Sequence, residues 1–451
     1  MQNFLLNKSD HMKQKPIFTT LLFLIFPGIF LMAQGNNDEL KLSLKEAQEY
    51  AIHNNKMVKS AKFTVLASQK DIWTTISSGL PQVSAGANLT DNLKLGVFVL
   101  TMNGVTTTIT MGMTYNLPVS VQASMPLFSA PYYIGIETSK LAQKMAESNL
   151  QSTEIDTRQA VASSYYLILI SEESLRILKE NLSNLRETLK STKAMYNSGL
   201  AEATDVDQMA SNVTMMENSF SNLQNTIEMN YNLLRFQLGV KFDTKIILTE
   251  TIDDLVKDIN VEAMLAQNFN PATNIQYDLV DKQEKLSALD LNAQKAMALP
   301  SLSGVYLTST SGMGMKMSDL RWYPSSYLGL NLSVPIFASG QRYSSIQKAK
   351  INLEKARNTK EMVSDQLQMQ DKQLRYNLEN ANIQYKSQKD NVDVSKRVYS
   401  SMENKYKQGM ASSLELIESN GLYLQAENNY ISSLMNLLQT KLALDKLLNN
   451  M

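Results

Sequence analysis

The side chains that most often perform chemistry in proteins are scarce in this sequence. Its 451 residues contain no cysteine and only two histidines, His11 and His53. The lack of cysteine excludes disulfides, thiolate metal ligands and thiol nucleophiles. His53 lies in the first helical segment without a nucleophile or an orienting acid beside it. We therefore expect it to be a hydrogen-bonded or solvent-exposed histidine without a catalytic role. We expect no enzyme activity, no cofactor and no bound metal.

Methionine is the remaining side chain with metal chemistry. The sequence has 25 methionines, among them Met313, Met315 and Met317. Thioether groups can bind soft ions such as Cu(I), but methionine much more often fills irregular apolar space. We interpret these residues as apolar filler.

The N-terminal residues 1–33 predict a signal peptide. Lys13 and Lys15 precede an apolar run from Ile17 to Met32, and Ala33 offers a small residue for cleavage. A retained anchor is the alternative, although the run is short for a membrane helix. Met12 is an alternative start, because the residues before it add nothing to the signal. No later segment has the ~18 consecutive apolar residues of a membrane-spanning helix.

Long helices organise the rest of the chain. The segment from Gln341 to Gln408 contains neither glycine nor proline, and its apolar residues return every seventh position. A helix of this length would be about 100 Å long, which no compact domain can contain. Heptad spacing gives narrow seams between helices instead of one broad buried face. The seams alone would also suit an exported coiled-coil scaffold or adhesin, which is the alternative interpretation.

Two segments switch from a helical to an alternating pattern. Strands are expected over about 81–127 and about 300–337, with Asn103-Gly104 as a turn in the first. Apolar residues there alternate mostly with Ser, Thr, Asn and Gln. The same alternation occurs in soluble β-sandwiches, but a sandwich needs a second sheet to pack against. The long polar helices around these strands provide no such sheet. Lipid on one face and a watery lumen on the other explain the alternation better.

The same order of elements occurs twice. Pro126-Leu127-Phe128 is repeated at Pro335-Ile336-Phe337, and the glycine that ends a long helix at Gly199 is repeated at Gly409. This spacing indicates a tandem duplication. We expect a first repeat at 34–239, a connecting equatorial segment at 240–262 and a second repeat at 263–451. The expected helices are at about 42–78, 132–198 and 200–238, and then at about 272–298, 341–408 and 411–449.

These features resemble the TolC-type outer-membrane efflux proteins. The residues that carry the resemblance are the start Leu42-Ser43-Leu44-Lys45-Glu46-Ala47, the junction Pro-Ile-Phe-Ala-Ser-Gly at 335–340, and the turns Tyr-x-x-Gly-x-x-x-x-x-Asp at 196–205 and Tyr-x-x-Gly-x-x-x-x-x-Glu at 406–415. The resemblance implies a mostly α-helical protein with a membrane β-barrel portion. In that family, three chains form a homotrimer whose twelve-stranded barrel, with four strands from each chain, is continued by a periplasmic α-helical barrel.

The resemblance also implies a location, a function and partners. It implies the outer membrane of a Gram-negative bacterium with a long periplasmic extension, and a passive exit duct for drugs or other small molecules in a tripartite efflux pump. The implied partners are outer-membrane lipid, a periplasmic adaptor protein and an inner-membrane transporter of the RND or ABC type.

Four strands cannot close a barrel with a pore, whereas a ring of chains can. The balance of 43 basic and 43 acidic residues argues against a nucleic-acid partner.

By the same resemblance, the two turns form the periplasmic tip. The acidic positions that narrow the family's pore correspond to Glu415 and Glu418, and the acid of the first turn is Asp205. The position of the latching arginine is Ala411, so the closed state is expected to be held differently. We hypothesise that three copies of Glu415 and Glu418 form carboxylate rings that select cations; charges that suit a helix N-terminus are the alternative. Adaptor contact is expected at Tyr196, Gly199, Leu200, Thr204, Tyr406, Gly409, Met410 and Ser413.

Five aromatic residues cluster where the strands turn into helices. An aromatic girdle at the periplasmic face of the membrane is one interpretation, and packing at a crowded junction is the other. The residues are Phe128, Tyr132, Tyr133, Phe337 and Tyr343.

Overall fold

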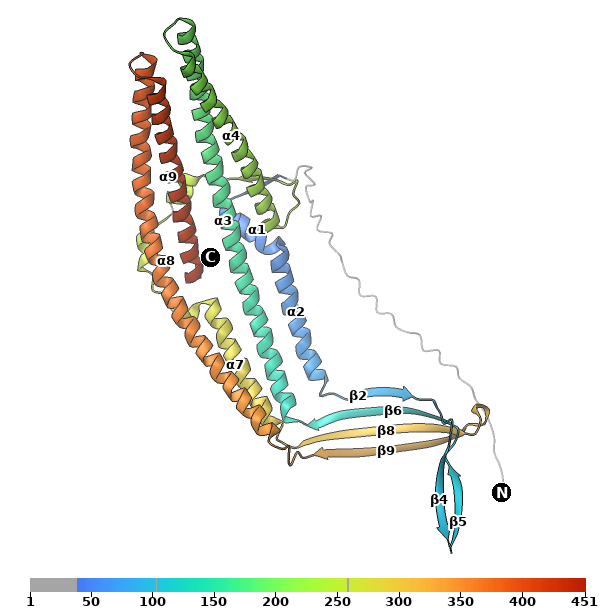
Figure 1. Ribbon diagram of the computed structural model, residues 1–451. Helices are drawn as coiled ribbons and strands as arrows, with labels where there is room; N and C mark the ends of the chain where they lie inside the picture. The colour runs from blue at the N-terminus through green and yellow to red at the C-terminus, as the bar shows by residue number, and fades with distance from the viewer. Residues whose placement is uncertain (1–38, 103, 258) are drawn as a thin grey trace, which may run out of the picture. The chain divides into compact units, whose positions relative to one another are not determined.

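Two long helical hairpins and a β-sheet make up most of the chain that is described in the computed structural model (Figure 1). The structure describes residues 39–102, 104–257 and 259–451. The predicted signal peptide at 1–33 lies outside these ranges, as does Asn103 of the predicted turn. Within the described residues, no helix combines the length and the apolar content needed to cross a lipid bilayer.

The helices of the two halves have matching lengths. The helix before each sheet segment has 22 residues, the long helix after it has 68 or 67, and the returning helix has 36 in both halves. These equal lengths indicate that the halves are structural repeats. The helices are α2 (Lys56–Ser77), α3 (Ala130–Asn197) and α4 (Ala203–Leu238), and then α7 (Ile275–Ala296), α8 (Gln341–Lys407) and α9 (Ser413–Leu448).

The prediction of a single helix over 42–78 is wrong, because the segment is divided into α1 (Leu44–Asn54) and α2. Asn55 leaves the helical conformation, and its side-chain oxygen accepts hydrogen bonds from the N–H groups of Met57 and Val58 at 2.7 and 3.3 Å. This asparagine therefore caps α2. Its amide nitrogen also donates to the carbonyl of Gln237 at 2.7 Å, which fixes the break against the end of α4.

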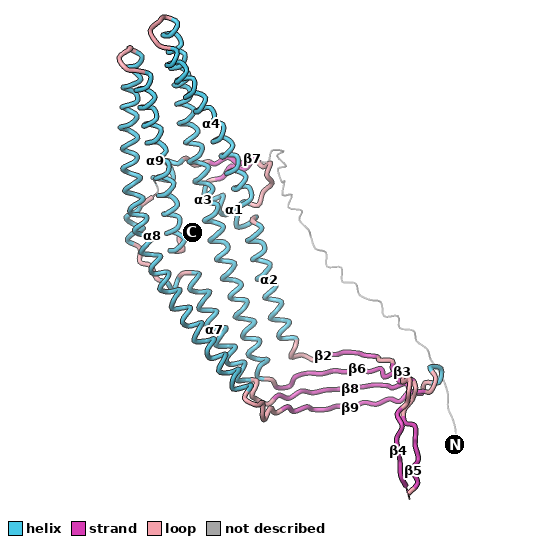
Figure 2. The backbone as a smooth tube through the Cα atoms, in the orientation of Figure 1, coloured by secondary structure: helices cyan, strands magenta, loops and turns pink. Residues whose placement is uncertain are grey.

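Four antiparallel strands form the main sheet in the order β2-β6-β8-β9 (Figure 2). Their bounds are β2 (Gln82–Ala87), β6 (Tyr115–Phe128), β8 (Ser301–Gly314) and β9 (Arg321–Ser333); a short β3 (Thr90–Asp91) also pairs with β6. The helix η2 (Met317–Asp319) connects β8 to β9. The strand expected at about 300–337 therefore ends at Ser333, and the residues up to Gly340 form a loop.

The strands expected over about 81–127 form two separate groups, because the chain between β2 and β6 contains a hairpin of its own, β4 (Gly96–Met102) and β5 (Val105–Met111). Gly104 of the predicted turn lies between these two strands. The alternation of apolar residues continues from β5 into β6, but the strand does not. Gly112 has a φ of 110°, which an extended strand cannot contain, so β5 ends before it and β6 begins at Tyr115.

In β2, β6 and β9 the strand register places mostly apolar side chains on one face and mostly polar ones on the other. β8 mixes the two kinds, since Leu307 lies opposite Gln122 and Thr308 lies opposite Val121. Val83, Ala123, Tyr306 and Leu328 are aligned across the four strands on one face. The other face carries rows such as Gly86, Ser120, Ser309 and Ser325, in which the hydroxyls of Ser309 and Ser325 lie 2.9 Å apart. Among the described strands, β2 and β9 each have a neighbour on one side only.

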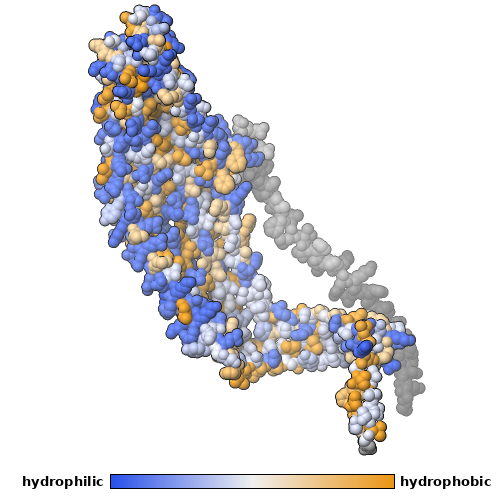
Figure 3. Space-filling model, viewed as in Figure 1, coloured by the Kyte–Doolittle hydropathy of each residue, from blue (hydrophilic) through white to orange (hydrophobic). Residues whose placement is uncertain are grey.

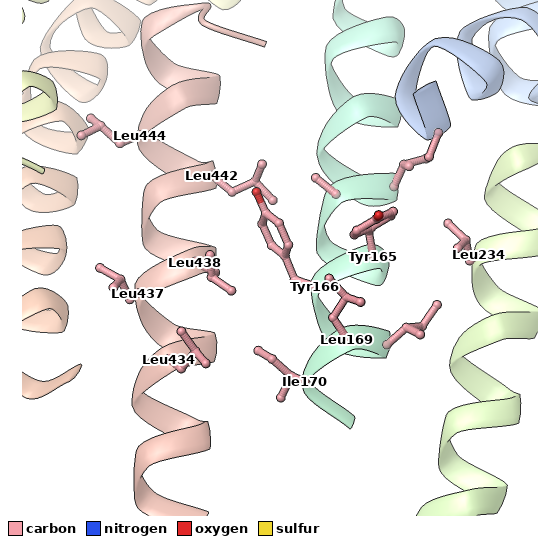
Figure 4. Packing of buried hydrophobic residues seen from close by; sticks show 14 of the residues in the cluster. Tyr165, Tyr166, Leu169, Ile170, Leu234, Leu434, Leu437, Leu438, Leu442 and Leu444 are labelled. Carbon is pink, nitrogen blue, oxygen red and sulfur yellow. The ribbon is translucent and has the colours of Figure 1, made fainter. Parts of the chain in front are cut away.

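The main core surrounds the middle of α3. Tyr165 of α3 lies toward Leu234 of α4, and Tyr166 of α3 lies toward Leu438 of α9 (Figure 4). All four side chains are buried. The segment after α4 contributes β7 (Lys245–Leu248), α5 (Ile252–Lys257), α6 (Val261–Ala266) and η1 (Pro271–Thr273), and β7 pairs in parallel with β1 (Glu39–Leu42). The hydroxyl of Tyr165 donates to the carbonyl of Leu42 at 3.2 Å, which ties this small sheet to the core.

Candidate functional site

Each helical hairpin turns on a glycine in the left-handed conformation. Gly199 has a φ of 73° and Gly409 a φ of 71°. A residue with a Cβ atom is strained in this conformation. In both turns the amide after the glycine donates to a carbonyl of the last helical turn, from Leu200 to Met195 and from Met410 to Lys405, each at 2.8 Å. The two turns, residues 196–205 and 406–415, are called the turn end below.

An acidic side chain caps the helix that follows each turn. The carboxylate of Asp205 accepts a hydrogen bond from the N–H of Glu202 at 3.0 Å. The carboxylate of Glu415 accepts from the N–H and the hydroxyl of Ser412 at 2.8 and 2.9 Å, while its own N–H donates to the Ser412 hydroxyl at 3.3 Å. This reciprocal pattern is a capping box. The backbone N–H and hydroxyl of Ser412 hold the pKa of Glu415 below its ordinary value.

Asp205 also connects the two turns. Its other carboxylate oxygen accepts a hydrogen bond from the hydroxyl of Ser413, which is buried at the start of α9. A second link lies between the long helices, where the hydroxyls of Tyr406 and Thr192 are 2.6 Å apart and buried. Both hairpins are therefore hydrogen-bonded to each other close to their turns.

An apolar cluster supports the second turn. It comprises the buried side chains of Met209, Tyr399, Tyr406 and Leu416. Ala411 packs against this cluster and is partly buried. An arginine at this position would place a charge against apolar side chains, which costs free energy unless the charge is paired. The link between Asp205 and Ser413 joins the turns without such a cation.

Glu418 follows Glu415 by one turn of α9 and is exposed to solvent. It takes no part in the capping box, whose carboxylate is that of Glu415. The three predicted gate residues thus have different environments. Asp205 is hydrogen-bonded to both turns, Glu415 caps α9, and Glu418 exposes its carboxylate to water.

The residues expected to contact an adaptor differ in exposure. The side chains of Leu200 and Met410 are 79% and 66% exposed, and Tyr196 is half exposed. Tyr406 and Ser413 are buried and make the contacts between hairpins. Figure 3 shows hydrophobic residues among hydrophilic ones at this end of the helices. Exposed apolar side chains beside the two turns are the kind of surface that a docking partner covers.

The five junction aromatics do not share one environment. Tyr132 donates its hydroxyl to the carbonyl of Ile76 at 3.0 Å, and a Cβ at Gly79 would lie 2.3 Å from its ring. Tyr132 is therefore a packing residue at the end of α2. The other four side chains are between 46% and 84% exposed; they are Phe128, Tyr133, Phe337 and Tyr343. For these four exposed side chains the aromatic girdle stays a prediction.

No three histidine, cysteine, aspartate or glutamate side chains in the described part of the chain lie close enough to hold a metal ion. The sulfur of Met315 lies 3.9 Å from the hydroxyl of Thr114, which is a contact between the loops at one end of the sheet.

Thr192 lies just before the turn end and was not among the predicted site residues. It precedes Tyr196 by one helical turn, so both lie on the same side of α3. Buried polar residues at helical spacing, such as Thr188 and Thr192, were the available signal, but they do not reveal that the partner of Thr192 is Tyr406 of another helix.

A family model described as "Outer membrane efflux protein" matches residues 48–240 and 283–450, and so covers most of both repeats. Among curated proteins, the chain is 22% identical over 254 residues to the outer membrane protein TolC of Vibrio cholerae. That match covers 52% of this chain and 54% of the relative, so it spans about half the length of the curated protein.

Solved structures with the same fold cover nearly the whole chain. The outer membrane protein VceC from Vibrio cholerae is 13% identical with a TM-score of 0.69, over 90% of this chain and 95% of that chain. CusC is 16% identical with a TM-score of 0.71, over 90% and 92% of the two chains. The open state of the MtrE outer membrane channel of Neisseria gonorrhoeae is 14% identical with a TM-score of 0.68, over 90% and 88%. The expected fold class is thereby confirmed.

Proposed function

Because the chain belongs to the outer membrane efflux protein family, we propose that it is the outer-membrane channel of a tripartite efflux pump. Its role is that of a passive exit duct, through which drugs or other small molecules cross the periplasm and the outer membrane. The protein itself is located in the outer membrane, with its helices extending into the periplasm.

The observation that carries this proposal is the separation of apolar from polar side chains along β2, β6 and β9 of the four-stranded sheet. The row through Val83, Ala123, Tyr306 and Leu328 is apolar, and the row through Ser120, Ser309 and Ser325 is polar. Lipid on the first face and water on the second would satisfy both sets of side chains. This arrangement supports a barrel wall with a hydrated lumen.

The free edges of β2 and β9 support a homotrimer. In lipid, each unpaired N–H and C=O group costs several kcal/mol, so an open sheet edge is not stable there. A second copy can pair its β2 with β9 of the first, and three copies would supply twelve strands. Closure at that size leaves room for an aqueous pore, which four strands do not.

The turn end is the proposed meeting point with the rest of the pump. Leu200 and Met410 offer exposed apolar side chains beside the two turns, and a periplasmic adaptor protein would cover them. An inner-membrane transporter of the RND or ABC type would supply the driving force through that adaptor. The duct would bind no nucleotide and no cofactor.

The same end is the proposed gate. The hydrogen bond between Ser413 and Asp205 would hold the two hairpins of one chain together in the closed state. Glu415 and Glu418 would form carboxylate rings in the trimer and favour cations. Glu415 can serve in a ring while it caps α9, because capping uses one of its two carboxylate oxygens.

Reconstitution of the purified protein in planar lipid bilayers tests the proposal. We expect a trimer in detergent and discrete ion conductance. Lysine in place of Leu328, on the apolar face, should reduce membrane assembly, since a cation facing lipid costs about 2–4 kcal/mol near the bilayer midplane. Lysine in place of Ser325, on the polar face of the same strand, should leave assembly intact and lower cation conductance.

A monomer that stays in solution without detergent and does not conduct would contradict the proposal, and would instead favour an exported coiled-coil scaffold. Equal assembly of the two lysine variants would contradict the assignment of the two sheet faces.

A further inference from the structure

A cavity of about 520 Å³ lies between the two helical hairpins. Side chains from α3, α4 and α9 line it, so it is formed within one chain. Most of its wall is apolar, with Leu178, Met215, Met216, Leu424 and Ile431 among the lining residues. Small-molecule pockets in proteins have volumes of about 300–1,000 Å³ and mostly apolar walls with a few polar groups. The cavity has both properties.

A glycine keeps one wall of this cavity open. Gly421 lies inside α9, where glycine is less favourable than alanine by about 1 kcal/mol. No atom lies within 4 Å of the position that a Cβ would occupy at Gly421. Neither a positive φ nor a close neighbour therefore requires glycine here. Its structural effect is to leave additional space beside the cavity.

A buried carboxylate lies on the same wall. Glu427 lines the cavity and is only 9% exposed. Burial is the main reason that its pKa is raised, and the nearby charge of Glu173 acts in the same direction. The groups that oppose this shift are Tyr423 on α9, Lys396 on α8 and Arg176 on α3. Arg176 is already engaged, because it forms ion pairs with Glu173 and Glu180 at 2.6 and 2.7 Å.

A second buried polar side chain of the wall also offers an acceptor. Asn420 is 6% exposed, and its side-chain oxygen has no hydrogen-bond partner among the described residues. A buried acceptor without a donor costs roughly 1–3 kcal/mol. Glu427 and Asn420 lie two helical turns apart on one side of α9, so the cavity wall offers two acceptors in an apolar setting.

We propose that this cavity binds a small amphipathic cation, whose apolar body fills the space beside Gly421 and whose protonated amine pairs with Glu427. A cation beside Glu427 would offset the cost of burying its carboxylate, and the apolar walls would remove the body of the ligand from water. The site is formed by one chain and lies outside the sheet, so it does not depend on the proposed channel function.

The test measures binding of desipramine, a tricyclic secondary amine, to the full-length protein in detergent by isothermal titration calorimetry. Its N-acetylated derivative has the same tricyclic body without the charge. We expect the amine to bind at least about tenfold more tightly than the neutral derivative, which corresponds to about 1.4 kcal/mol. Affinity should rise with pH as Glu427 loses its proton, up to the pKa of the amine.

Three variants locate the site. Glu427→Gln should remove the preference for the amine, and Gly421→Leu should weaken binding of both compounds because it fills the cavity. Glu379→Gln, at an exposed position of α8, is the matched control and should bind like the original protein. Circular dichroism melting checks that each variant is folded.

Equal affinity for the amine and the neutral compound overturns the proposal, and this comparison needs no variant. Unchanged amine binding by folded Glu427→Gln also overturns it. Conductance is not measured in this experiment, so failure of the site is distinguishable from failure of the channel proposal.

Discussion

Ser413 donates its hydroxyl hydrogen to Asp205 across 208 positions of the sequence, from the second helical hairpin to the first. The same carboxylate accepts the N–H of Glu202 at 3.0 Å and so caps α4. One side chain thus sets both the start of its own helix and the distance to the neighbouring turn. A change at Ser413 would break the second contact and leave the first intact.

Ser413→Ala should therefore loosen the closed state while α4 stays capped. A partly buried hydrogen bond to a charged group contributes about 1.5–3 kcal/mol, so the open fraction should rise by at least about tenfold. Conductance of the reconstituted channel measures this change. Ser401→Ala, at an exposed position of α8, is the control. Identical conductance of the two alanine variants would exclude Asp205–Ser413 as a latch.

Neutralising Glu415 and Glu418 separates the ring hypothesis from a helix-end role. Glutamine at 415 keeps a capping box, because Gln and Glu both serve at the third helical position. The double variant Glu415→Gln, Glu418→Gln should therefore keep its melting temperature but lose cation selectivity and block by divalent ions. A lower melting temperature with unchanged selectivity would assign both glutamates to the stability of α9 alone.

The same substitution should have opposite effects at two glycines. Gly409→Ala places a Cβ in the left-handed conformation and should destabilise the second turn by roughly 1–2 kcal/mol. Gly421→Ala lies inside α9 with open space around it and should stabilise the helix by about 1 kcal/mol. Thermal melting compares the two variants. A gain in melting temperature for Gly409→Ala would contradict the turn geometry.

Acid should weaken the contact between α7 and α8. The amino group of Lys360 lies 2.8 Å from carboxylate oxygens of both Asp281 and Glu284. Hydrogen bonds from Lys285 and Lys360 lower the pKa of Asp281, and the bond from Lys360 lowers that of Glu284. Carboxyl groups with a lowered pKa add stability above their ordinary values of 3.8 and 4.5, and this stability is lost as the pH falls through the folded-state values.

The melting temperature should accordingly fall as the pH is lowered from about 5 to 3, and Lys360→Met should show a smaller fall. Lys350→Met, at an exposed position of the same helix, is the control and should follow the original protein. A pH profile of Lys360→Met that matches the original protein would show that these carboxyl groups owe their low pKa to other neighbours.

The long helices could be predicted from the sequence because their determinants are local. Heptad spacing identifies the long helices, and the glycines that end them, Gly199 and Gly409, identify where each hairpin turns. The break at Asn55 was missed because the segment contains neither glycine nor proline there. The cap on Met57 and Val58 is local, whereas the bond that fixes the break to the carbonyl of Gln237 appears only in three dimensions. The separate hairpin β4–β5 was missed because the period of two continues through Gly112, and only the backbone conformation there shows the interruption.

Some features of the candidate site could likewise be predicted from the sequence, and others could not. The acidic positions Asp205, Glu415 and Glu418 could be identified from the spacing of the turns and the family resemblance. The pairing of Asp205 with Ser413, and of Thr192 with Tyr406, depends on how the two hairpins lie against each other, which no periodicity within one helix specifies. Glu427 reads in sequence as an ordinary polar position, and its burial between hairpins appears only in three dimensions.

The parallel pairing of β1 with β7 has a consequence for folding. Glu39 and Lys245 are 206 positions apart and bonded at 2.7 Å, so the start of the first repeat meets the connecting segment that follows it. Closing a loop of that size costs about 5 kcal/mol of chain entropy. Both strands of this small sheet lie within residues 39–248. The first repeat can therefore close on itself without any contribution from the second repeat.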